Sequence, residues 1–310
     1  MMEDKKPVPA ESVVRFPMPD DSHVLTFDLE RANLRGRVIR LGKVLDHILA
    51  PHHFPESIEK LLVETITISV LLSSMLKYEG IFILQAHGTG AVTRLVADVT
   101  SSGDIRGTAG YDADKLQQLV NENPDPNALD LLGAGYLAFT VDQGEFMERY
   151  QGIVELKNTL LESFHHYFDQ SEQIGTSIRM ASCKDDTGMW RVGAIMLQHV
   201  PDHSNIPQDS KPVAENWNRA RILLDTCTDA ELLDSKLHDE TLLYRLFHEE
   251  GVRVYTPHSV AKGCRCTPEK LKGVLSMLSD DDLAHAATEG HITMTCEFCN
   301  KDFVFGLDDV

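Results

Sequence analysis

Two pairs of closely spaced cysteines near the end of the chain limit its fold more than any other feature. The first pair is Cys264-Arg-Cys266, and the second, after 29 further residues, is Cys296-Glu-Phe-Cys299. Four cysteine thiolates arranged as a tetrahedron form a closed structural zinc site, which has no open position for a substrate. We therefore expect these four residues to bind one Zn²⁺ per chain and to stabilise a small terminal unit.

The residues around the pairs predict how this unit folds. β-Prone residues at 291–295 and 302–305 flank the second pair, which indicates a short hairpin with the metal at its tip. Between the pairs, apolar residues at helical spacing predict a helix over 268–278, and Ser279 is an N-cap signal for a second helix that ends at Gly290. The wide gap between the pairs fits a common zinc ribbon poorly.

The four cysteines have two other interpretations, namely two structural disulfides or four unrelated buried thiols. We favour zinc because paired cysteines in a reducing compartment are metal-binding or redox groups rather than permanent bridges. The other two cysteines, Cys183 and Cys227, stand alone in the sequence. We expect both to be ordinary thiols.

Length and charge narrow the classes of function. The chain has 310 residues, which predicts two compact units and a connector. Its formal net charge of −19 repels phosphate backbones and anionic membrane surfaces, so we expect neither nucleic acid nor a membrane as a partner. The first residues lack the apolar core of a signal peptide, and the longest apolar stretch, 66–76, is too short to cross a bilayer. We therefore expect a cytoplasmic protein.

The sequence pattern predicts an α+β core domain over residues 23–208, preceded by a flexible arm over 1–22. Strands and helices are mixed without strict βαβ alternation, which indicates helices packed on a mainly antiparallel sheet. The strand at 37–41 alternates as a half-buried strand would, whereas the helix at 55–78 is apolar nearly all round in its second half and should be buried. The expected strands are 37–41, 81–85, 92–99, 105–111, 135–141, 151–154, 178–181 and 190–197, and the expected helices are 43–50, 55–78, 113–120 and 159–167.

Residues 209–255 predict a helical, metastable linker, followed by the zinc-binding unit at 256–310. The linker carries three short helical segments, which cover 212–227, a stretch that opens with the capping box Thr228-x-x-Glu231, and 239–251. Isolated helices this short are hardly stable in water, so they must depend on their neighbours. The segment is either an ordinary helical linker or a conditional element that exposes apolar side chains when a neighbour releases it. Its candidate client-binding residues are Trp217, Leu224, Leu232, Leu233, Leu242, Leu243, Leu246 and Phe247.

The cysteine pairs and several core segments together resemble the redox-regulated 33 kDa heat-shock chaperone family (HslO). The similar core segments are 35–41, 76–80, 135–144, 150–154 and 168–173, so the resemblance covers roughly residues 24 to 305. The chain departs from the family pattern in its longer N-terminal arm and in the lone Cys183 and Cys227. These departures leave the zinc prediction untouched but put in doubt which thiols an oxidant reaches first.

The resemblance implies an ATP-independent holdase, not an enzyme, that binds unfolding client proteins under oxidative stress. It implies that oxidation forms one disulfide within each pair, Cys264 to Cys266 and Cys296 to Cys299, and that the active form can dimerise. A bond between Cys264 and Cys266 closes a very small ring, so it should be easily reduced again. Loss of zinc should unfold the terminal unit and release the linker helices.

Two other functions compete with this hypothesis. A thiol-disulfide oxidoreductase also uses Cys-x-x-Cys, but it places the motif after a strand, at the start of a helix, whereas strand-like residues follow Cys299. A zinc-ribbon nucleic-acid module is the second alternative, and the negative charge of the chain opposes it.

Overall fold

The computed structural model describes residues 21–144, 150–168, 175–199, 211–288 and 290–307. Within these ranges two six-stranded sheets and one two-stranded hairpin are present. Contacts between residues divide the chain into two compact units. The first unit comprises residues up to 43, 70–75 and 161–260, and the second comprises 44–69, 76–160 and 261 onward. The predicted arm at 1–22 lies almost wholly outside the described residues.

The sheet of the first unit has the strand order β10-β1-β2-β9-β8, with β11 pairing on β1 as well. Every pairing in this sheet is antiparallel. Both faces of β2 are buried, since the neighbouring residues Val38 and Ile39 point to opposite faces and are both fully covered, so the expected half-buried strand at 37–41 was wrong. The strands are β1 (His23–Leu29), β2 (Leu34–Leu41), β8 (Thr176–Lys184), β9 (Trp190–His199), β10 (Val252–Val254) and β11 (His258–Ser259).

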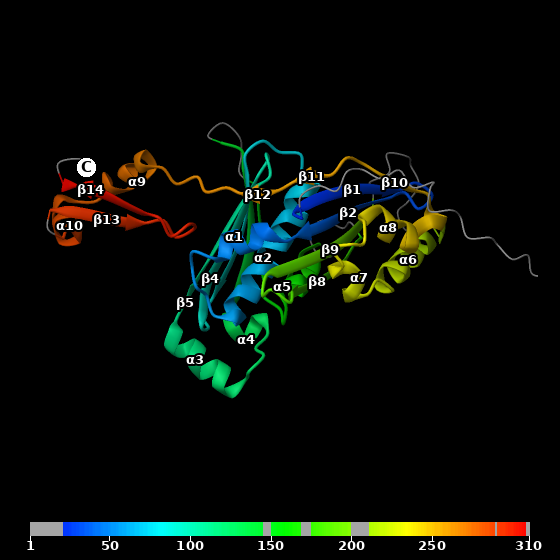
Figure 1. The fold of residues 1–310 in the computed structure, drawn as a ribbon, viewed down its shortest axis with the longest axis horizontal. Coiled ribbons are helices and arrows are strands. Elements are labelled where there is room, and N and C mark those ends of the chain that lie inside the picture. Colours follow the sequence, from blue (N-terminus) through cyan, green and yellow to red (C-terminus); the bar gives the residue numbers. More distant parts are fainter. Residues whose placement is uncertain (1–20, 145–149, 169–174, 200–210, 289, 308–310) are drawn as a thin grey trace, which may run out of the picture. The chain divides into compact units, whose positions relative to one another are not determined.

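Three helices of the predicted linker pack on this sheet (Figure 1). They are α6 (Lys211–Asp225), α7 (Asp229–Leu233) and α8 (Asp239–Phe247), and a 3-10 turn at His248–Glu250 follows α8. The capping box of Thr228 and Glu231 is present at the start of α7, as the sequence predicts. Gly251 has φ 72°, a left-handed conformation that suits glycine, and ends the helical stretch.

The sheet of the second unit has the order β12-β5-β4-β3-β6-β7, in which only the pairing of β12 with β5 is parallel. The three-stranded meander expected over 81–111 is confirmed as its centre. One short helix, α4 (Ala128–Leu132), stands where only a loop was expected. The strands are β3 (Ile81–Gly88), β4 (Val92–Thr100), β5 (Asp104–Tyr111), β6 (Gly135–Asp142), β7 (Tyr150–Glu155) and β12 (Ala261–Lys262).

The remaining helices are α1 (Lys43–Leu49), α2 (Glu56–Met75), α3 (Ala113–Glu122) and α5 (Leu160–Tyr167). The second half of α2 is buried, as expected. Its polar residues are compatible with burial because the hydroxyls of Thr65, Thr67 and Ser69 each donate a 2.8 Å hydrogen bond to the carbonyl four residues earlier. No described helix is long and apolar enough to span a membrane.

The cysteine-rich end of the chain forms two short helices and a hairpin. Helix α9 (Pro268–Leu275) and helix α10 (Asp280–Ala286) both end a few residues earlier than expected. Strands β13 (His291–Thr295) and β14 (Asp302–Gly306) pair antiparallel and confirm the predicted hairpin. The fold is therefore α+β with mainly antiparallel sheets, as the sequence predicts. The division into a core at 23–208, a linker at 209–255 and a zinc-binding unit at 256–310 stays a prediction.

Candidate metal centre

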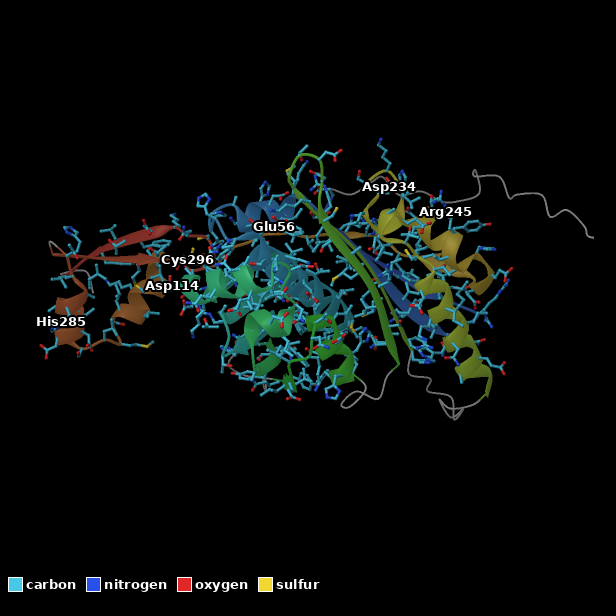
Figure 2. The ribbon with its side chains drawn as sticks, turned by 90° about the horizontal axis from the view of Figure 1, so that it is seen from below. Glu56, Asp114, Asp234, Arg245, His285 and Cys296 are labelled. Atoms are coloured by element: carbon cyan, nitrogen blue, oxygen red, sulfur yellow. The ribbon has the colours of Figure 1, made fainter. Side chains whose placement is uncertain are left out.

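Two turns bring the four cysteines together. Cys264 and Cys266 directly follow β12, whose edge is fixed by a hydrogen bond from the Gly263 amide to the Ile105 carbonyl (2.9 Å). A side chain at position 263 would collide with Asp104, so glycine is needed for this close approach. Cys296 lies at the end of β13, as Figure 2 shows, and Cys299 precedes β14. We call residues 264–266 and 296–299 the cysteine turns.

The four sulfur atoms have the spacing of a tetrahedral metal site. All four Sγ atoms lie within 4.8 Å of one another. The distances are 3.3 Å from Cys264 to Cys266, 3.7 Å from Cys264 to Cys296, and 3.5 Å from Cys266 to Cys299. A zinc ion with Zn–S bonds of about 2.3 Å requires sulfurs roughly 3.8 Å apart. The cluster therefore fits a four-thiolate zinc site with little adjustment.

The four thiols alter one another's pKa values, so they cannot all ionise independently. Burial opposes ionisation of Cys264, but hydrogen bonds from the Cys266 amide and from the other three thiols lower its pKa to about 7. Burial and the neighbouring thiols raise the pKa of Cys266, and burial raises that of Cys299. Four negative charges cannot gather here on their own, and a divalent cation is the group that makes four thiolates compatible.

A small apolar cluster surrounds the sulfurs. Cys296 and the side chains of Leu275, Ile292, Phe303 and Phe305 form its buried part. This buried cluster is too small to stabilise a fold by hydrophobic burial alone. The bound metal would therefore carry much of the stability of this end of the chain.

The residues between the cysteines contact the sheet of the second unit. Arg265 donates a hydrogen bond to Asp98 of β4 (2.6 Å), and Arg106 of β5 donates to the other oxygen of the same carboxylate (2.8 Å). The Arg106 guanidinium lies 3.8 Å from the centre of the Phe298 ring, a cation–π distance. Both cysteine turns thus meet one pair of residues on the sheet.

Three weaker contacts lie next to the contacts with Asp98 and Arg106. Arg94 forms a 2.8 Å ion pair with Glu297, which is more than half exposed. The His52 ring bonds the Phe298 carbonyl (3.1 Å), and Asn300 donates to the Pro51 carbonyl (2.9 Å). None of the sheet residues in these contacts, Arg94, Asp98 and Arg106, was expected from the sequence. A weak signal was present, because Asp98 and Arg106 are charged residues within the expected strands 92–99 and 105–111.

The predicted client-binding residues gather on the first sheet. Leu224, Leu232, Leu242, Leu243 and Phe247 are fully buried, and Leu246 is 7% exposed. Trp217 and Leu233 are partly buried against the same cluster. The Trp217 ring also packs on His199, with ring centres 4.9 Å apart. Whether these residues bind clients stays a prediction.

Ion pairs join the linker helices to that sheet as well. The Asp239 carboxylate at the start of α8 bonds His23 of β1 (2.6 Å) and Arg40 of β2 (2.9 Å), and all three side chains are nearly buried. Burial opposes ionisation of Asp239, but the bond from His23 and the charge of Arg40 outweigh it and hold its pKa below the usual range. Within the linker itself, Arg219 of α6 forms a bidentate pair with the buried Glu250 of the turn after α8 (2.5 and 2.8 Å).

The two lone cysteines lie outside the cluster. Cys183 is half-buried in β8, and Cys227 follows α6 with 1% of its surface exposed. Burial raises the pKa of the Cys227 thiol to about 11, which keeps it protonated and unreactive. The Cys-x-x-Cys motif itself lies between two strands of a hairpin, not at the start of a helix. That position is not the one used by thiol-disulfide oxidoreductases.

Comparison with known proteins finds relatives that match nearly the whole chain. The family model described as Hsp33 protein matches residues 22–306. The 33 kDa chaperonin of Caulobacter vibrioides (strain NA1000 / CB15N) is 35% identical over 293 residues, which cover 93% of this chain and 95% of the relative. This chain belongs to the Hsp33 family. The 33 kDa chaperonin of Pseudomonas fluorescens (strain SBW25) is 34% identical, with 94% of this chain and 93% of the relative covered.

A solved structure supports the fold independently of close sequence similarity. The crystal structure of the 33 kDa chaperonin from Thermotoga maritima, an Hsp33 homologue, matches with a TM-score of 0.77 at 21% identity. The match covers 93% of this chain and 96% of the other. This match supports the fold, whereas the family model and the curated relatives confirm the resemblance read from the cysteine pairs and core segments and place the chain in a chaperone family.

Proposed function

We propose that this chain is a redox-regulated holdase that binds unfolding proteins without ATP in a reducing compartment, the cytoplasm. The observation that carries the proposal is the convergence of four sulfur atoms within 4.8 Å in a chain of the Hsp33 family. In this proposal the reduced protein is inactive and binds one zinc ion through Cys264, Cys266, Cys296 and Cys299. Bound zinc keeps these residues as thiolates and holds the two cysteine turns together.

Oxidation would convert each pair into a disulfide. One thiolate attacks a peroxide oxygen and becomes a sulfenic acid while hydroxide leaves, and the second thiolate then displaces the sulfenic hydroxyl as hydroxide. Each pair thereby transfers two electrons to one peroxide molecule and consumes two protons to give two waters. We place the bonds within the pairs, Cys264 to Cys266 and Cys296 to Cys299. The sulfur distances across the pairs are similar to the one within the first pair, so peptide mapping of the oxidised protein must decide this pairing.

The oxidised protein would then expose apolar surface to clients. Unfolding of the cysteine-rich end is proposed to destabilise the linker helices, whose buried leucines and Phe247 supply contact surface for partly unfolded chains. The active form is proposed to be a homodimer. Neither nucleic acid nor a membrane has a part in this function.

The decisive experiment measures light scattering from an aggregating client protein. The full-length chain is added either zinc-loaded and reduced, or after peroxide treatment at mildly raised temperature. Suppression of aggregation by the oxidised form alone supports the proposal, and rereduction with zinc should reverse it. If neither form suppresses aggregation, the holdase proposal is wrong and the cysteine cluster is purely structural.

A further inference from the structure

A single buried carboxylate on the second sheet links both cysteine turns to the chaperone core. Asp98 is 2% exposed, and each of its oxygens accepts a hydrogen bond from a different guanidinium. Arg106 is its direct cross-strand partner in the register of β4 and β5, so this pair belongs to the sheet itself. Arg265 comes from 167 residues away and is the one residue between Cys264 and Cys266.

The second cysteine turn reaches the same two residues by a different interaction. Arg106, fixed by Asp98, lies over the ring of Phe298, and Phe298 lies between Cys296 and Cys299. We call Asp98 and Arg106 the docking pair. It contacts the first cysteine turn through a charge-assisted hydrogen bond and the second through a cation–π contact.

Two buried polar atoms at this attachment, Arg265 Nη1 and Arg94 Nε, lack a hydrogen-bond partner among the described residues. Such an unpaired buried donor opposes the bound arrangement and offsets part of the favourable ion pairing. The net stabilisation by this attachment is therefore smaller than its ion pair and cation–π contact alone would give.

We propose that the docking pair senses the redox state of the cysteine cluster, which deepens the function proposed above and rests on it. While the four sulfurs converge, Arg265 and Phe298 are both held in position for the docking pair. When peroxide takes two electrons from Cys264 and Cys266, as proposed above, the new disulfide closes a ring that contains the Arg265 backbone, and the changed backbone of this ring is proposed to turn the Arg265 side chain away from Asp98. Release of Arg265 leaves Asp98 with Arg106 alone, which loosens Phe298 and frees the cysteine-rich end from the sheet.

The test uses Arg265→Gln in the full-length, reduced, zinc-loaded protein. This variant removes the cation from the cysteine turn but leaves Asp98 paired with Arg106, so the sheet should fold normally. The matched control is Glu297→Gln, which removes an exposed ion pair of the other turn. The first measurements are zinc content and hydrogen exchange of amides in residues 291–306 and in β4 and β5.

We expect Arg265→Gln to keep one zinc ion per chain while the amides of 296–300 exchange about tenfold faster, a loss of the size expected for a charge-assisted hydrogen bond. Zinc release under peroxide should be faster to a similar degree. Glu297→Gln should match the wild type in both measurements. Asp98→Asn should act like Arg265→Gln if it folds, but the arginine variant decides the question.

Exchange and zinc release equal to wild type in Arg265→Gln would overturn the proposal. These measurements do not depend on chaperone activity. If the oxidised wild type fails to suppress aggregation but Arg265→Gln still loosens residues 296–300, the docking pair stands and only the holdase proposal fails.

Discussion

The linker helices and the cysteine turns are attached to their sheets in opposite ways. Helices α6 to α8 bury a continuous apolar cluster on the first sheet, with five leucine or phenylalanine side chains of these helices fully covered. The cysteine turns contact the second sheet mainly through one buried ion pair, one cation–π contact and one exposed ion pair. The first attachment is broad and apolar, whereas the second is narrow and polar.

This difference bears on the order in which the two attachments would be released during the proposed activation. Each fully buried leucine or phenylalanine contributes about 1.5–3 kcal/mol through removal from water, so the linker attachment is strong even if its helices are weak alone. A few polar contacts contribute much less in net terms. We infer that oxidation releases the cysteine turns first and that the linker needs an additional perturbation, such as heat.

The largest expected effect comes from removing two metal ligands. Cys296→Ser combined with Cys299→Ser should abolish zinc binding, because structural zinc in such modules contributes roughly 10 kcal/mol or more of apparent free energy. The cysteine-rich end should unfold, and the protein should suppress client aggregation in part without oxidant. Colorimetric zinc content and hydrogen exchange measure the first two effects. Full zinc retention would contradict the four-thiolate site, and Cys183→Ser is the matched control that should retain zinc.

The next effect tests the strength of the linker attachment. Leu224→Ala removes a fully buried side chain of α6 and should lower the free energy of unfolding of the first unit by about 3–4 kcal/mol, because it leaves a cavity. Zinc content should not change. The control is Ile222→Ala in the same helix, whose side chain is 60% exposed and should cost under about 1 kcal/mol. Oxidised Leu224→Ala should become active at a lower temperature than wild type, and an unchanged temperature would contradict the inferred order of release.

The sequence predicted the elements well where a local signal exists. The capping box at Thr228 and Glu231, the hairpin around Cys296 and the buried half of α2 all follow from spacing or periodicity, and the structure contains each of them. The expected half-buried strand at 37–41 failed because long-range packing covers both faces of β2. Local alternation of polar and apolar residues could not show that Arg37 is buried. This charged side chain is covered by the fold and donates a hydrogen bond to the Ser74 carbonyl.

The candidate site was predictable only in part, for a similar reason. The four cysteines are close in sequence within each pair, so their spacing alone points to a metal. Asp98 and Arg106 are far from them in sequence, and no spacing rule connects a strand residue to a turn 167 positions later. Only the paired register of β4 and β5 shows that the two charges form one contact point.

A smaller loss of stability is expected when the polar contacts of the linker attachment are removed and its apolar contacts are kept. Asp239→Asn keeps the shape of the side chain but removes the charge bonded by His23 and Arg40, and should cost about 2–3 kcal/mol near neutral pH. Because the pKa of Asp239 is lowered in the folded protein, its charge stabilises the fold above the unfolded pKa, about 3.9. That contribution is lost as pH falls from there through the lowered folded value.

Stability curves against pH for Asp239→Asn and wild type should therefore differ most above about pH 4 and converge below it. Asp225→Asn is the control, because Asp225 is exposed at the end of α6. A constant difference at every pH would show that Asp239 acts through packing instead of charge.

The smallest expected effect concerns the border of the cysteine turns. Glu297→Gln removes the exposed pair with Arg94 and should change stability by less than about 1 kcal/mol, because solvent and salt screen such pairs. Arg265→Gln should instead show a larger change that persists in high salt, since Asp98 is buried. The measurement is hydrogen exchange of residues 296–300 at low and high ionic strength. Equal exchange rates in the two variants at both ionic strengths would contradict a specific role of the docking pair. The cysteine turns would then be attached by general electrostatic attraction, without one buried contact to contrast with the apolar linker attachment.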